Sequence, residues 1–133
     1  MDAPTSRPLS PHLGVYRWQV QMVTSILHRA TGVALGFGAL LLLAGLLALA
    51  AGPAAFASFR DVVASPLGQL LLLGWTWAFA YHLCNGLRHL LQDAGWGFAP
   101  PTFVRNGWLV AAASLLLTVA AWSWVLLASG GAA

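Results

Sequence analysis

His82 stands inside a stretch of the chain that otherwise looks membrane-spanning. From Pro66 to Leu87 the chain has no Arg, Lys, Asp or Glu, and ~20 apolar residues are enough to cross a hydrocarbon core. Ionisable side chains at such depth commonly mark functional sites. A neutral imidazole binds iron well, so axial ligation of a haem is the first specific chemistry that this residue suggests. The alternative is a structural histidine, hydrogen-bonded to a backbone carbonyl of a neighbouring helix.

Small residues accompany His82 at helical spacing. Gly74, Ala78 and Gly86 lie at four-residue steps from it along the chain. Small side chains allow a second helix to approach closely, or leave a slot for a flat macrocycle. The spacing is therefore compatible with both interpretations of His82.

The second axial ligand of a six-coordinate haem is hard to find in this chain. His89 lies ~10 Å further along the same helix, too far to reach the same iron atom. His12 lies outside the predicted spans, and we expect His28 to be a helical turn or more shallower than His82. The second ligand is therefore expected from another polypeptide, with His28 as the less favoured alternative.

Ser25, His28 and Arg29 form a second group, at the start of the first apolar run. Because Ser25 and Arg29 are four residues apart, their hydroxyl and guanidinium share one helix face. Such a pair can bind a carbonyl oxygen and stabilise the negative charge that develops on it during reduction. The alternative is that Arg29 only extends toward lipid headgroups. We expect Arg29 and His82 to approach the same membrane face from two helices, which would make a carbonyl site and a haem neighbours.

The composition identifies the elements that must position these residues. The chain is 59% hydrophobic and 7% charged, with a mean hydropathy of +0.78, values that exclude an ordinary soluble domain. The basic residues do not form the concentrated patch that a nucleic-acid surface needs, so no nucleic-acid partner is expected. The sequence predicts an all-α integral membrane protein whose surroundings are membrane lipid.

Three uncharged runs predict three transmembrane helices, separated by two breaks. Gly52-Pro53 ends the first helix, and Ser65-Pro66 has the order of an N-cap followed by proline at the first helical position. Residues 95–106 are expected to be a bent connector, because Pro100-Pro101 cannot continue a helix. The predicted parts are an irregular N-terminal segment (1–21), one transmembrane domain (22–128) with helices at about 22–51, 66–94 and 106–128, and a short tail (129–133).

The distribution of arginine predicts the orientation of the chain. The opposite side of the membrane carries only Arg60 and an uncharged C-terminus, so the positive-inside rule places the N-terminus inside and the C-terminus outside. A cleaved signal peptide is disfavoured because the first apolar run is long and begins only after Arg29. The arginines predicted on the inner side are Arg7, Arg17, Arg29, Arg88 and Arg105.

Three motifs resemble those of a known family. They are Arg7 to Leu13 (RPLSPHL), Ser25 to Gly32 (SILHRATG), and His82 to Leu90 (HLCNGLRHL) with Asp93 after it. In this order and spacing they are similar to the cytochrome b anchor subunits of succinate dehydrogenase, the respiratory complex II that joins the tricarboxylic acid cycle to electron transport. The resemblance covers nearly the whole chain.

The resemblance implies roles for particular residues. His82 matches the axial ligand of haem b, whose other ligand lies on a second membrane anchor. Ser25 and Arg29 match residues that line the ubiquinone pocket, and His28 and Arg29 match the surroundings of the haem propionates. The segment before the first span matches one that contacts the iron–sulfur subunit, and succinate oxidation belongs to a flavoprotein subunit.

The resulting expectation is a subunit of succinate:ubiquinone oxidoreductase in a bacterial inner membrane, with the mitochondrial inner membrane as the less favoured location. No catalytic residue is assigned, and no activity is expected from the isolated chain. One alternative is the anchor of a fumarate reductase that uses menaquinone. The other is a helical scaffold without redox chemistry. Asp93 is expected to pair with an arginine at a helix end, with proton transfer as the alternative role.

Overall fold

The computed structural model describes residues 12–130, and all regular secondary structure in this range is helical. The all-α fold is therefore confirmed. Expectations for residues 1–11 and 131–133, including Arg7 and most of the N-terminal segment, lie outside the described residues. The elements in order are a short 3-10 helix η1 (Leu13–Val15) and the helices α1 (Val20–Ala51), α2 (Pro53–Ala64), α3 (Pro66–Asp93) and α4 (Pro100–Gly130).

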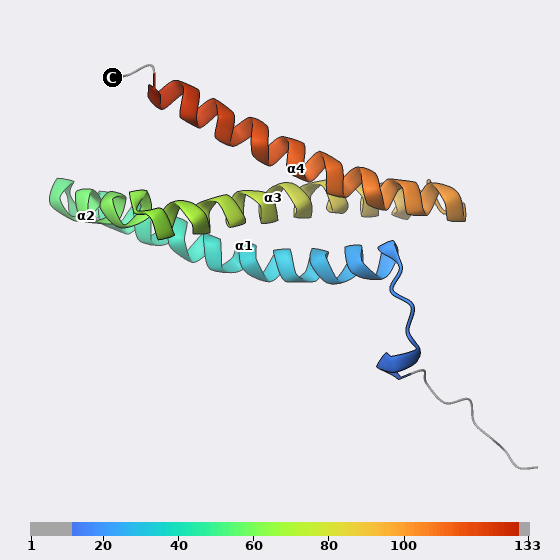
Figure 1. Cartoon of the computed structure of the whole chain (residues 1–133). Helices are drawn as coiled ribbons and strands as arrows, with labels where there is room; N and C mark the ends of the chain where they lie inside the picture. The colour runs from blue at the N-terminus through green and yellow to red at the C-terminus, as the bar shows by residue number, and fades with distance from the viewer. Residues whose placement is uncertain (1–11, 131–133) are drawn as a thin grey trace, which may run out of the picture.

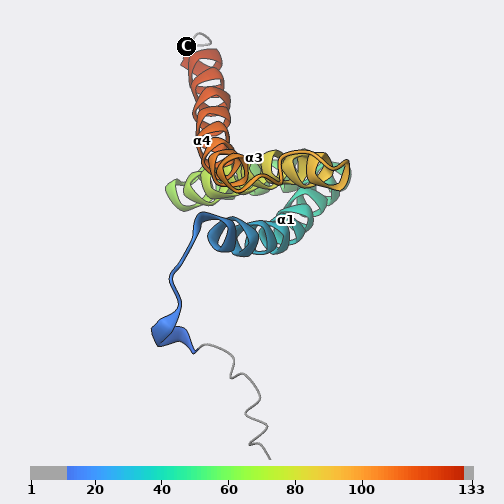
Figure 2. The same cartoon turned by 90° about the vertical axis from the view of Figure 1, so that its right-hand side faces the viewer.

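Helix α3 is the centre of the arrangement, with α1 and α4 packed against it. Figure 1 shows α1 and α3 running in opposite directions, so that the start of α1 lies at the same end as the last turns of α3 and the first turns of α4. From there α4 diverges from α3 toward its C-terminus, which both views show (Figures 1 and 2). One end of the molecule thus collects the start of α1, the end of α3 and the start of α4.

The predicted connector between the first two spans is itself a helix, α2. Gly52 ends α1 with φ 117°, a backbone conformation that glycine adopts readily. The predicted cap of α3 is confirmed, because the Ser65 hydroxyl accepts a hydrogen bond from the Gly68 N–H at 3.2 Å. Helices α2 and α3 meet at 76°. The backbone of α3 passes close to the end of α2 at this bend, since a Cβ at Gly68 would lie 2.5 Å from the carbonyl oxygens of Val62 and Val63.

The expected connector at 95–106 was wrong in its second half, because α4 begins at Pro100. Two adjacent prolines interrupt a helix interior but fit a first turn, where the missing N–H groups have no intrahelical partner in any case. The turn itself uses Gly95 and Gly97, whose φ values are 88° and 82°. Helix α4 therefore starts about two turns before the uncharged run that begins at Gly107.

Helices α1 and α4 are each long and apolar enough to cross a membrane, while α3 meets that standard only together with α2 as a bent pair. The described residues thus contain two clear spans, or three if the α2–α3 pair counts as one. The interior between the helices is small and polar, and most leucines face outward. Thr31, Ser114 and Thr118 are buried and donate to carbonyls of their own helices at 2.7 to 2.8 Å. This distribution suits a chain surrounded by lipid.

Candidate functional site

The imidazoles of His82 on α3 and His28 on α1 are stacked. Their ring centroids are 3.9 Å apart and their planes differ by 12°. The expectation that His28 lies a turn or more shallower than His82 was wrong. Helix α1 begins at Val20, well before the uncharged run, and the antiparallel register of α1 and α3 brings the two residues to the same level.

The hydrogen bonds of His82 determine which of its ring nitrogens carries the proton. Nδ1 lies 3.1 Å from the backbone oxygen of His28 and 3.3 Å from Oγ1 of Thr31. The carbonyl oxygen can only accept, so Nδ1 is the protonated nitrogen and Nε2 keeps its lone pair. Thr31 donates its own proton to the carbonyls of Leu27 and His28, at 2.7 and 3.0 Å. This tautomer, held by a backbone carbonyl, is the one that metal-binding imidazoles use.

Glycines allow the two rings to come together. A Cβ at Gly32 would lie 3.1 Å from Cε1 of His82, which is tighter than an ordinary contact, and one at Gly86 would lie 3.9 Å from Cε1 of His28. A Cβ at Gly74, by contrast, would meet no atom within 4 Å. Of the small residues predicted around His82, Gly86 therefore lies at the contact with α1, and Gly32 of α1 completes it.

His89 extends the group to three imidazoles. Its ring centroid lies 5.2 Å from that of His28, with the planes at 57°. The fully buried Asn85 is 3.2 Å from Nε2 of His89 and accepts a hydrogen bond from Arg88 at 3.2 Å. Among residues 12–130, no three His, Cys, Asp or Glu side chains are placed to hold one metal ion together. The described residues can thus offer a metal single imidazoles, not a complete set of ligands.

Ser25 and Arg29 flank His28 on α1. Ser25 is half-buried and Arg29 is exposed, and neither side chain has a hydrogen-bond partner within the described part of the chain. Nδ1 of His28 is buried and also has no partner there. The Ser25 hydroxyl and the Arg29 guanidinium are therefore available to a molecule outside this chain, whereas Nδ1 of His28 is enclosed by it. Asp93, in contrast, is exposed at the end of α3, and it forms no ion pair with an arginine of residues 12–130.

Sequence reasoning missed the residues that support this site. The buried Tyr81, next to His82, donates to the backbone oxygen of Thr24, one turn before His28, at 3.3 Å and so ties α3 to α1. Thr31 and Asn85 orient His82 and His89 as described above. A tyrosine or asparagine inside an apolar run is the one sequence signal that points to such contacts, since each must find a buried partner.

Comparisons with known proteins place these features in a family. Residues 4–121 match the family model described as succinate dehydrogenase/fumarate reductase transmembrane subunit. The succinate dehydrogenase cytochrome b556 subunit of Paracoccus denitrificans is 45% identical over 86% of this chain and 88% of its own length. That of Rickettsia felis is 41% identical over 87% and 90%. The mitochondrial cytochrome b560 subunit of Sus scrofa is 42% identical over 86% and 67%.

Proposed function

The chain belongs to the family of succinate dehydrogenase/fumarate reductase transmembrane subunits, and from this membership we propose that it is the membrane-anchor cytochrome b subunit of a succinate:ubiquinone oxidoreductase. In this role it holds the soluble subunits at the membrane, supplies one ligand to haem b and lines the site where ubiquinone is reduced. The isolated chain has no activity of its own.

His82 would hold the iron of haem b through Nε2 of its imidazole. The observation that carries this proposal is the hydrogen bond from its Nδ1 to the backbone oxygen of His28, because it leaves the lone pair of Nε2 for iron. The imidazole is half-buried, and Gly32 and Gly86 leave room for it beside α1. Haem b, when bound, accepts and returns single electrons. A second anchor subunit would hold the same haem together with His82.

His28 and Arg29 hold the propionates. The half-buried His28 imidazole and the exposed Arg29 are neighbours on α1. A ring N–H of His28 would donate to a propionate oxygen. The adjacent Arg29 guanidinium adds a charge-assisted donor to the same group.

Ser25 and Arg29 line the quinone site. One turn of α1 separates them, so both reach one carbonyl oxygen of a bound ubiquinone. The guanidinium stabilises negative charge that develops on this oxygen as electrons arrive, and the hydroxyl donates a second hydrogen bond. The iron–sulfur subunit and the second anchor complete the pocket.

The exposed surface of α1 supports a contact with the second anchor subunit. Only 6% of the most apolar stretch of α1 is buried within this chain, against 17% for α4, so α1 has a long face for the second anchor subunit. We place three spans in the membrane, counting the α2–α3 pair as one, with the N-terminus inside and the C-terminus outside. The iron–sulfur and flavoprotein subunits bind on the inner side of a bacterial inner membrane.

The spectrum of the purified complex tests the haem assignment. His82→Ala is expected to remove or shift the reduced-minus-oxidised α and Soret bands, since it deletes an axial ligand. The control is His89→Ala, which removes an imidazole of the same cluster and is expected to keep both bands. An unchanged spectrum for His82→Ala in an assembled complex contradicts the assignment, and a colourless wild-type complex indicates a scaffold without redox chemistry.

The family description also includes fumarate reductase, which is the second candidate function. Extraction and identification of the quinone that co-purifies with the complex separates the two. Ubiquinone agrees with our proposal, and menaquinone favours the fumarate reductase.

A further inference from the structure

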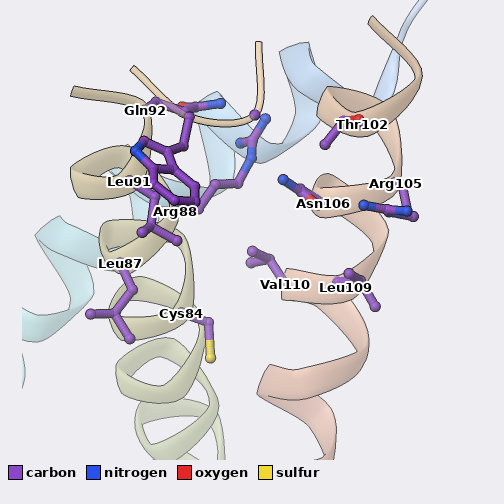
Figure 3. Close-up of a pocket in the computed structure, with 12 residues that line it drawn as sticks. Cys84, Leu87, Arg88, Leu91, Gln92, Thr102, Arg105, Asn106, Leu109 and Val110 are labelled. Carbon is purple, nitrogen blue, oxygen red and sulfur yellow. The ribbon is translucent and has the colours of Figure 1, made fainter. Parts of the chain in front are cut away.

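A cavity of about 380 Å³ lies between the end of α3 and the start of α4. It is separate from the histidine site, because His82 faces α1 whereas this cavity opens between α3 and α4. Figure 3 shows Arg88 extending from α3 toward α4, with Thr102 and Asn106 opposite it. None of the roles proposed above involves this cavity.

Arg88 is a buried cation that this chain does not neutralise. Its side chain is 6% exposed. The guanidinium lies 4.3 Å from the ring centroid of Phe103 and donates once, from Nη1 to Asn85. Its Nε and Nη2 are buried without partners. Of the acids within residues 12–130, Asp61 pairs with Arg60 and Asp93 is exposed. A buried charge with unpaired donors strongly destabilises the fold unless an anion neutralises the charge and accepts the hydrogen bonds.

Further donors surround the same space. Nε2 of Gln92 is buried without a partner, and the first turn of α4 contains no acidic residue. The positive end of that helix therefore adds to the charge of Arg88. Arg105 also lines the cavity. The anion that fits is one with several acceptor oxygens, as phosphate has.

The walls on the membrane side are apolar. Leu87 and Leu91 of α3 and Leu109 of α4 line the cavity below the arginines, and all three are more than half exposed. A ligand here meets cationic donors at one end and leucines along the helices toward the membrane interior. This is the chemistry of an amphiphile with an anionic head and hydrocarbon chains.

We propose that this cavity binds a glycerophospholipid, with its phosphate on Arg88 and Gln92 and an acyl chain along Leu87, Leu91 and Leu109. A free phosphate ion would use the same donors but would gain nothing from the leucines. A carboxylate from a partner subunit would likewise leave the apolar groove unfilled. The lipid is the occupant that accounts for both the charge and the groove.

The experiment measures lipid binding to the intact complex. The complex is stripped of lipid by detergent washing, and native mass spectrometry follows the binding of phosphatidylglycerol, of diacylglycerol and of inorganic phosphate. Phosphatidylglycerol is expected to bind the wild type, and Arg88→Gln to weaken that binding by at least about tenfold, because charge-assisted hydrogen bonds are lost. Arg60→Gln, at an exposed ion pair on α2, is the control and is expected to bind as the wild type does.

Each result decides the proposal. The proposal is overturned if Arg88→Gln and the wild type bind phosphatidylglycerol equally. It is also overturned if inorganic phosphate displaces bound phosphatidylglycerol as effectively as added phosphatidylglycerol does. Loss of the iron–sulfur subunit from Arg88→Gln without a change in bound lipid assigns the guanidinium to a partner carboxylate instead. If Arg88→Gln fails to assemble, Leu109→Trp tests the site instead, since its larger side chain fills the groove from an exposed position. Phosphatidylglycerol binding equal to that of the wild type would then refute the site. The haem spectrum is expected to stay unchanged in these variants, so this test is independent of the one for His82.

Discussion

Gly32→Ala and Gly36→Ala add the same methyl group to the same helix and meet different surroundings. A Cβ at Gly36 has no atom within 4 Å, whereas one at Gly32 lies 3.1 Å from Cε1 and 3.6 Å from Nδ1 of His82. Both substitutions gain the same helix propensity, up to about 1 kcal/mol. The comparison therefore isolates the effect of pressing on the imidazole.

The imidazole has little freedom to move away. Its Nδ1 is held by the backbone oxygen of His28, and the His28 ring lies against one of its faces. Overfilling a packed site costs about 1 to 3 kcal/mol. We expect Gly36→Ala to be neutral or slightly stabilising, and Gly32→Ala to be less stable than Gly36→Ala by that amount.

Two measurements on the purified complex check this expectation. Thermal unfolding in detergent gives the difference in stability. The reduced-minus-oxidised spectrum shows whether the haem senses the displaced ring, and a shifted α band is expected for Gly32→Ala alone. Identical unfolding midpoints and spectra for the two variants would refute the argument, since the close contact would then have no consequence.

Two further predictions concern the quinone site and the bend before α3. Arg29→Ala is expected to lower quinone reductase turnover of the purified complex by about 10²-fold or more, as the loss of an oxyanion donor does. The control, Arg60→Ala, is expected to keep the turnover of the wild type. Unchanged turnover in Arg29→Ala contradicts the quinone assignment. Ser65→Ala removes the cap of α3 and is expected to cost about 1 kcal/mol in thermal unfolding, whereas Ser58→Ala, an exposed serine of α2 bonded only to its own helix, stays within experimental error of wild type. Equal stability of the two serine variants would show that the cap contributes nothing.

Much of the fold was predictable because it depends on local chemistry. Long uncharged runs predicted the helices, and Gly52-Pro53 and Ser65-Pro66 marked two of their ends correctly. The same kind of reasoning misjudged Pro100-Pro101, because a proline pair is compatible with either a connector or a first helical turn. The three motifs indicated the family, which the comparisons confirm.

The candidate site depended on the tertiary structure instead. His28 and His82 are 54 positions apart, and their stacking follows from the register of α1 against α3, which Gly32 and Gly86 permit. Neither hydropathy nor helical spacing contains that register. The sequence by itself therefore determined a helical membrane chain with His28, Arg29 and His82 as its chemical groups. Only the packing of α1, α3 and α4 decided that the two imidazoles share a level and that Arg88 faces a separate cavity, because those contacts join residues whose local sequences carry no information about one another.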